Sequence, residues 1–276
     1  RKTFVKSYLF FFQAEDGIRD VLPNAQIPSE NDVFRPIREL GIEYWYELFN
    51  PRQLLVLLKL LKYVKERTEQ LIKENGEYGA AIALYLALGI SKSFNFNNIT
   101  TTWDNSTSTI RELVDHYSRN RSVNLGLEYC EVWLTEKNLP WVFEPHVESL
   151  TKTAGGILPV LKLLSEWLEG LSDHVEVYNG DARKLNEILG SKKVDLINVD
   201  PPYLAQHFYS DLMEFFWQFL RIMLQPAIDK GYLFNRDPSR GKVELFIEGW
   251  SPYLSILPRE DEIIARRGPE ELNDLS

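Results

Sequence analysis

Apolar residues recur every three or four positions from residue 50 to residue 91, which predicts two successive helices. Asn50-Pro51-Arg52 is a start signal, because asparagine is a good N-cap and proline suits the first helical position. Leucines at helical spacing follow, and lysines occupy the opposite face. Gly76 is expected to end the first helix, and an alanine-rich second helix is expected over residues 77–91.

The same spacing returns over residues 157–171, where another amphipathic helix is predicted. Between these helices, residues 95–108 are rich in Asn, Thr and Ser and are expected to form a polar loop. Residues 109–119 are moderately helical in pattern. Residues 21–172 are therefore predicted to form a mainly helical region.

The pattern changes after residue 172. Residues 174–178 alternate apolar and polar positions as a strand does, and Asn179-Gly180-Asp181 follows with turn chemistry. Residues 182–189 suit a short helix, and residues 194–199 form an apolar run of strand length. Strand, helix and strand at this spacing predict a βαβ unit, and hence an α/β domain with a parallel sheet over residues 173–276.

A strongly apolar and aromatic helix is predicted over residues 212–224, with Asp211 and Glu214 in capping-box spacing at its start.

The first twenty residues are expected to be foreign to the natural protein. Their Phe10–Asp20 stretch resembles the translation of a common sequencing-library adapter, and such segments are excluded from fold reasoning. The plainer alternative is an amphipathic N-terminal segment.

The composition adds three constraints. The chain of 276 residues is 44% hydrophobic and 26% charged, which is ordinary for a globular protein. Its net charge of −9 is unfavourable for contact with nucleic-acid phosphates, although it leaves room for a local basic groove. The single cysteine, Cys130, excludes an internal disulfide and any zinc site of several thiolates. With no apolar run long enough to span a membrane, a cytoplasmic protein without membrane contact is expected.

The strongest chemical signal is the tetrapeptide Asp200-Pro201-Pro202-Tyr203, directly after the predicted strand over residues 194–199. At average residue usage, it arises by chance in about one chain in a thousand of this length. Ligands of open α/β sheets bind beyond the carboxyl ends of strands, where this strand delivers the tetrapeptide. An incidental Pro-Pro turn is the alternative.

Each residue of the tetrapeptide suits methyl transfer to an exocyclic amine. Such an amine is a poor nucleophile, because its lone pair is delocalised into the ring. The Asp200 carboxylate and the Pro201 carbonyl provide two acceptors for the N–H groups, which localises the lone pair. Proline holds its carbonyl rigidly because its φ is fixed. Tyr203 presents a flat face on which a flipped base can stack.

The tetrapeptide resembles the catalytic motif of amino-methyltransferases acting on DNA, and its Asp form is typical of N6-adenine enzymes. The wider chain is similar to large archaeal and bacterial adenine-specific DNA methylases with an N-terminal domain of unknown function. Two stretches carry that likeness over roughly residues 21–224. They are Leu48-Phe49-Asn50-Pro51-Arg52-Gln53-Leu54-Leu55 and the run from Tyr209-Ser210-Asp211-Leu212 through Phe215-Phe216 to Leu220-Arg221.

The resemblance implies a partial Rossmann-like methyltransferase sheet that uses S-adenosylmethionine, preceded by the helical region. It implies double-stranded DNA as the partner, with the target adenine flipped out, and association with other defence or restriction-modification proteins. It places Gly180 and Asp181 at the methyl donor, although a strand-ending turn explains that pair equally well. His207 and Tyr209 are weaker candidates for contact with the target base.

The family's glycine-rich donor loop is absent from the chain, as is the acidic residue expected for the donor's ribose. The chain is therefore expected to be a fragment that holds the acceptor-side half of an active site. Two alternatives remain open. In the first, the methyl acceptor is an RNA base, the N4 amine of cytosine or a protein glutamine amide. In the second, the chain is a non-catalytic fragment that binds DNA or a protein.

Overall fold

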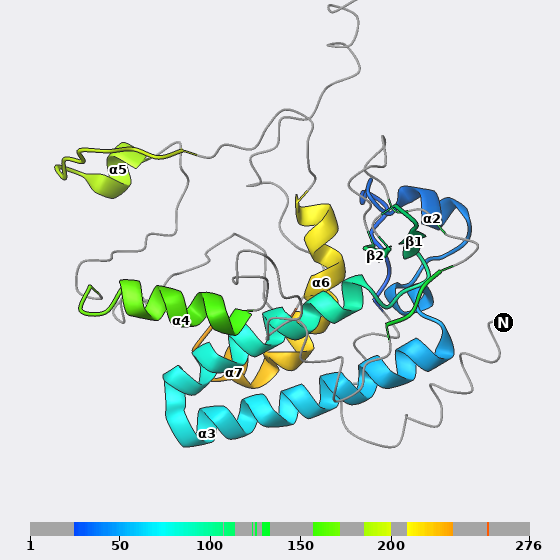
Figure 1. Ribbon diagram of the computed structural model, residues 1–276, viewed down its shortest axis with the longest axis horizontal. Coiled ribbons are helices and arrows are strands. Elements are labelled where there is room, and N and C mark those ends of the chain that lie inside the picture. Colours follow the sequence, from blue (N-terminus) through cyan, green and yellow to red (C-terminus); the bar gives the residue numbers. More distant parts are fainter. Residues whose placement is uncertain are drawn as a thin grey trace, which may run out of the picture.

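The computed structural model describes residues 25–106, 108–113, 123, 125, 129–132, 157–171, 185–199, 209–233 and 253. Within these ranges the protein is mainly helical, with one small antiparallel sheet (Figure 1). None of the helices in the described ranges is long and apolar enough to cross a membrane.

The longest element is α3, Pro51–Asn95, which folds back on itself as two antiparallel arms (Figure 1). Asn50 caps it as predicted, since its side chain accepts a hydrogen bond from the Gln53 backbone N–H at 2.8 Å and Gln53 returns one. The reversal lies at Gly76, whose φ of 56° and ψ of −127° are non-helical. Gly79 then lets the arms touch, because a Cβ there would lie 2.0 Å from the Leu71 carbonyl oxygen.

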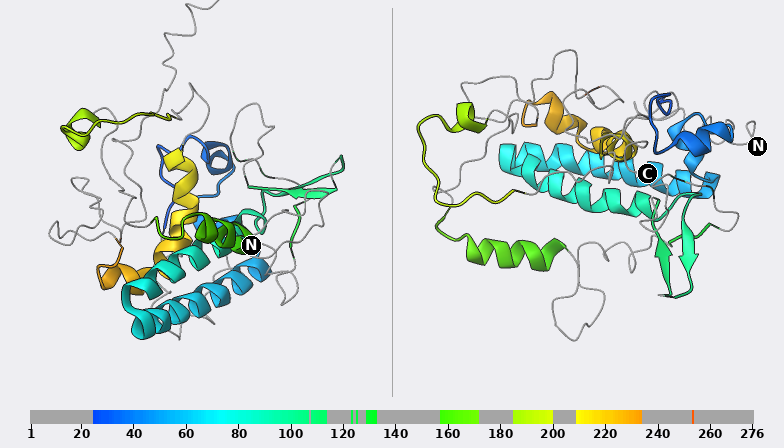
Figure 2. Two further views of the ribbon diagram at one scale, coloured as in Figure 1. Left: turned by 60° about the vertical axis from the view of Figure 1, so that its left-hand side comes forward. Right: turned by 90° about the horizontal axis from the view of Figure 1, so that it is seen from above.

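Two helices from late in the chain pack on α3: α6, Tyr209–Met223, and α7, Gln225–Asp229. Figure 2 shows both lying against the two arms. The short elements α2, Arg35–Glu39, and the 3₁₀ helix η2, Trp45–Leu48, complete the body. We call this assembly of α2, η2, α3, α6 and α7 the helical core.

The sheet is a hairpin of β1, Thr102–Asp104, and β2, Thr109–Arg111, paired antiparallel with Trp103 opposite Ile110. An ion pair of 3.0 Å between Arg111 and Asp104 spans the hairpin. The prediction of a continuous loop over 95–108 and of helix from residue 109 was therefore wrong at these strands. The cross-strand contacts that stabilise a hairpin do not show in helical periodicity.

Helices α4, Ile157–Trp167, and α5, Leu185–Leu189, form where helices were expected. No residue of α4 is buried, and the side chains of α5 whose burial is described are exposed or half-buried. Figure 1 shows α5 standing away from the helical core. The predicted strand over residues 194–199 is not formed, and its apolar side chains are exposed, from 50% for Val194 to 85% for Leu196. The parallel sheet is thus not seen in the described residues, because a buried parallel strand requires paired neighbours on its flanks.

Candidate functional site

The candidate catalytic residues Asp200, Pro201, Pro202 and Tyr203 lie outside the described residues. The same is true of the predicted donor-binding residues, Gly180 and Asp181, and of His207. Tyr209 is described as the first residue of α6, with its side chain 51% exposed. The structure therefore describes the two flanks of the tetrapeptide, which are residues 194–199 before it and α6 after it.

The two flanks differ sharply in burial. Upstream, Ile197 and Val199 are 63% and 69% exposed. Downstream, α6 begins three residues earlier than capping-box spacing predicted, so that Asp211 lies inside its first turn. Asp211, Glu214, Phe215 and Gln218 are all fully buried in the helical core. The chain that follows the tetrapeptide is consequently anchored from α6 onward.

The apolar anchor of α6 is a group of rings that we call the aromatic cluster: Phe34, Trp45, Phe49, Phe94, Phe215 and Phe219. Phe219 stacks on Phe94 with ring centroids 4.2 Å apart. Phe215 is placed centrally, with centroids 6.1 Å from Phe34, 6.1 Å from Phe49 and 5.2 Å from Phe219. Such stacked and edge-on pairs add to the free energy gained by burial. The aromatic stripe of α6 is thus core, as its helical spacing indicated.

A polar anchor holds the first two turns of α6, and we call it the Asn31 junction. The Asn31 Nδ2 donates to the Asp211 carbonyl oxygen at 2.9 Å and to Glu214 Oε2 at 2.8 Å. The backbone N–H of Asp32 donates to Asp211 Oδ2 at 2.8 Å. Asn31, Asp211 and Glu214 are each 0% exposed. The junction therefore joins two segments about 180 residues apart through buried hydrogen bonds.

Asn31 is itself held in place by the residues that follow it. Its Oδ1 accepts from the Phe34 backbone N–H at 3.1 Å, and its carbonyl oxygen accepts from Arg38 Nη2 at 2.9 Å. Both donor hydrogens of its amide are thus used on α6 while its oxygens are used locally. The electrostatics also favour Asp211, because the first turn of a helix stabilises negative charge.

The far end of α6 carries a buried cation, Arg221. Burial lowers the pKa of its guanidinium to about 10, which leaves the group charged at neutral pH. Its Nη2 donates to Gln218 Oε1 at 3.1 Å and its Nη1 to the Tyr253 carbonyl oxygen at 3.2 Å. The Tyr253 hydroxyl donates to Asp229 of α7 at 3.1 Å. The residue at position 253 is thereby tied to both late helices.

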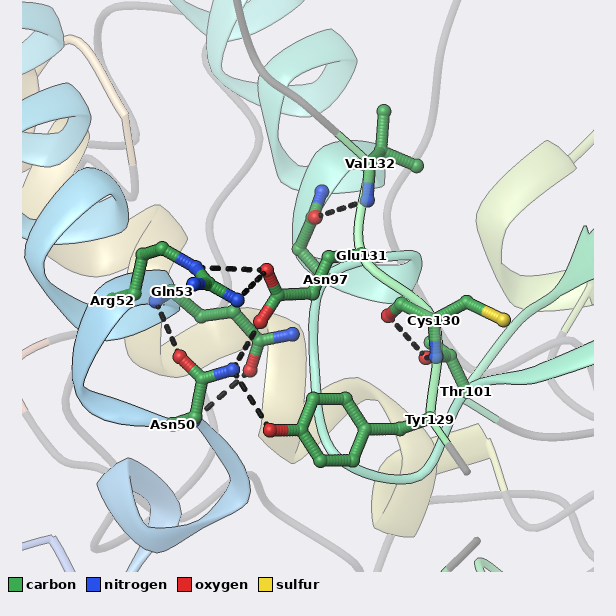
Figure 3. A network of polar contacts seen from close by, with 9 residues as sticks. All are labelled: Asn50, Arg52, Gln53, Asn97, Thr101, Tyr129, Cys130, Glu131 and Val132. Atoms are coloured by element: carbon green, nitrogen blue, oxygen red, sulfur yellow. Dashed lines mark hydrogen bonds and ion pairs between the residues drawn. The ribbon is translucent and has the colours of Figure 1, made fainter. Parts of the chain in front are cut away.

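A second polar network surrounds the start of α3, and we call it the cap network (Figure 3). Arg52 donates to Glu131 Oε2 through Nε at 3.0 Å and through Nη2 at 2.7 Å. The Asn50 side chain donates to Glu131 and to the Tyr129 hydroxyl. The segment of residues 129–132 is thus fastened to the stretch Asn50-Pro51-Arg52-Gln53 that the sequence singled out.

The same segment is fastened on its other side to the residues after α3 (Figure 3). The Cys130 backbone N–H donates to Thr101 Oγ1 at 3.1 Å, and the Val132 N–H donates to Asn97 Oδ1 at 2.8 Å. Burial raises the pKa of the Cys130 thiol above its ordinary value. Within the described ranges, no three His, Cys, Asp or Glu side chains are grouped to hold a metal ion.

Sequence reasoning missed Asn31 and Glu131, both of which lie in stretches without periodicity. A weak signal for Asn31 does exist: asparagine favours turns because its side chain bonds to nearby backbone groups, as its Oδ1 does with the Phe34 N–H. No local pattern in the sequence indicates the hydrogen bonds from Asn31 to α6, because they join distant segments. Glu131 likewise has no local pattern that points to Arg52.

No protein-family model, curated protein or solved structure matches this chain. The resemblance to adenine-specific DNA methylases therefore stays a prediction from the motifs in the sequence.

Proposed function

We propose that the chain is part of an enzyme that transfers a methyl group from S-adenosylmethionine to the N6 amine of adenine in DNA. The observation that carries this proposal is the tetrapeptide Asp200-Pro201-Pro202-Tyr203. The firm anchoring of α6, which begins six residues after Tyr203, supports it, because a positioned active-site loop needs a rigid attachment. A location in the cytoplasm, where such DNA is found, belongs to the same proposal.

The chemistry assigned to the loop is positioning and charge placement. The Asp200 carboxylate accepts a hydrogen bond from one N–H of the target amine, and the Pro201 carbonyl accepts from the other. Both contacts localise the nitrogen lone pair, and Tyr203 holds the flipped base by stacking. The donor supplies an activated methyl group on a sulfonium centre, with Gly180 and Asp181 as its proposed contacts. Pro202 keeps the loop stiff between these groups.

The acceptor is tested by incubating the purified chain with radiolabelled S-adenosylmethionine and four substrates. These are adenine-containing duplex DNA, the same duplex with adenine replaced by 2-aminopurine, matched RNA, and a glutamine-containing protein digest. Label is expected in the first alone. Label in RNA, in cytosine of the control duplex or in protein would instead identify one of the other amine acceptors.

A second candidate function is a non-catalytic fragment that binds DNA or a protein. The observation that favours it is the contrast between the buried helical core and the exposed, unpaired residues 194–199. Calorimetry separates the two candidates. Binding of S-adenosylmethionine to the full chain supports the enzyme, whereas a flat titration with an intact circular dichroism spectrum supports the non-catalytic fragment.

A further inference from the structure

The Asn31 junction holds the N-terminal end of α6, which is the end nearer to the catalytic tetrapeptide along the chain. Asp211 is the third residue of the helix, and Glu214 lies one turn further on. Only residues 204–208 separate Tyr203 from the start of α6. Six extended peptide units span at most roughly 20 Å, so that the position of the first turn limits where Tyr203 can lie.

The aromatic cluster alone does not fix that first turn. Phe215 and Phe219 contact the core from the second turn of α6 onward, and in the first turn the partly buried Leu212 packs against it. Apolar burial of this kind is non-directional. Hydrogen bonds are directional and weaken steeply with angle. The two bonds from Asn31 Nδ2 and the one from the Asp32 N–H reach three different acceptors on α6. Together they set both the rotation of the helix about its axis and its height along that axis.

Asn31 is suited to this role because it does not move freely. The Phe34 N–H and the Arg38 guanidinium hold its two oxygens, so its amide is presented to α6 in one orientation. A side chain fixed by its own hydrogen bonds places its partner more accurately than a flexible one.

We propose that Asn31 is a positioning residue for methyl transfer, which acts through the first turn of α6 on the tetrapeptide that precedes it. This inference rests on the proposed function. Asn31 contacts neither substrate nor methyl donor in this account. Its loss is therefore expected to lower the rate of the chemical step while leaving the binding of the donor unchanged.

The test compares Asn31→Ala with the exposed neighbour Ser29→Ala in the full chain. The first change removes both bonds to α6, and the second leaves them intact. For Asn31→Ala we expect kcat on adenine-containing DNA to fall by between about tenfold and a hundredfold, the range caused by a misplaced catalytic group. We expect KM and the calorimetric affinity for S-adenosylmethionine to stay within about twofold of wild type.

A paired variant separates positioning from general damage to the fold. Asn31→Asp alone sets a third carboxylate against Asp211 and Glu214, and its kcat is expected to fall furthest. Adding Glu214→Gln lets the new amide donate to the introduced aspartate, which restores one bond with reversed polarity. The double variant is expected to recover most of that loss. No recovery would contradict the role of this contact.

Hydrogen exchange followed by mass spectrometry gives a readout that does not depend on activity. Asn31→Ala is expected to raise exchange at the Asp32 amide, which donates to Asp211, and at residues 213–214, the first amides that bond within α6, and to leave residues 217–223 protected. Equal deprotection of both would show that Asn31 merely stabilises the fold, and no change in either would overturn the proposal. If wild type transfers methyl to no acceptor, the proposed function fails, while the exchange result still decides whether Asn31 fixes the start of α6.

Discussion

Phe215 lies at the centre of the apolar anchor of α6. It is fully buried and has ring contacts with Phe34, Trp45, Phe49 and Phe219. Phe215→Ala removes all of these contacts at once. Truncation of a buried phenylalanine to alanine costs about 3–5 kcal/mol, and the loss of several aromatic pairs places this site near the upper end. A domain of this kind has a free energy of unfolding of about 5–15 kcal/mol, so the loss is a large fraction of it.

The neighbouring residue, Phe216, provides a matched control for this substitution. Phe216 is only partly buried at the edge of the same core, and its truncation is expected to cost about 1–2 kcal/mol. Urea unfolding followed by circular dichroism at 222 nm measures both variants. With a slope of about 2 kcal/mol per molar urea, Phe215→Ala is expected to lower the midpoint by about 2 M and Phe216→Ala by less than about 1 M. Equal midpoints for the two variants would refute the assignment of Phe215 to the centre of the core.

Three further results are expected. Gly79→Ala should destabilise the chain by about 3 kcal/mol in the same urea assay, because its Cβ would meet the Leu71 carbonyl at 2.0 Å. Gly41→Ala meets no neighbouring atom and should cost only about 1 kcal/mol, the strain of an alanine at its φ of 87°. Arg52→Ala should speed alkylation of Cys130 by iodoacetamide several-fold, because it frees Glu131 and loosens residues 129–132; an unchanged rate would show that the cap network does not hold them. Because burial raises the pKa of Cys130 and only the thiolate reacts, the wild-type alkylation rate should continue to rise at pH values where that of an unburied cysteine has levelled off.

The helical core was largely predictable where local signals were strong. Asn50 and Pro51 marked the start of α3, and Gly76 marked its reversal, since each residue has a backbone preference that acts locally. The α6 helix was also expected from its periodicity, although it begins earlier, at Tyr209. Its first turn is decided by the bonds from Asn31, and a contact between residues 180 positions apart leaves no local pattern.

The predicted parallel sheet, in contrast, is not seen in the described residues, although the apolar pattern indicated it. Residues 194–199 have the composition of a buried strand, but they lie exposed and unpaired. An apolar run becomes a strand when neighbouring strands satisfy its backbone groups, and composition alone does not supply them. The catalytic role of the tetrapeptide that follows this run is predicted from the chemistry of its residues, and an activity measurement tests it.

The most direct measurement is mass-spectrometric detection of N6-methyladenine in duplex DNA after incubation with S-adenosylmethionine. Wild type, Asp200→Ala and Asp195→Ala are compared, the last because Asp195 is an exposed acid just before the loop. We expect N6-methyladenine with wild type and with Asp195→Ala, and a loss of at least about a hundredfold with Asp200→Ala. Equal methylation by Asp200→Ala and wild type would contradict the role of the tetrapeptide in catalysis.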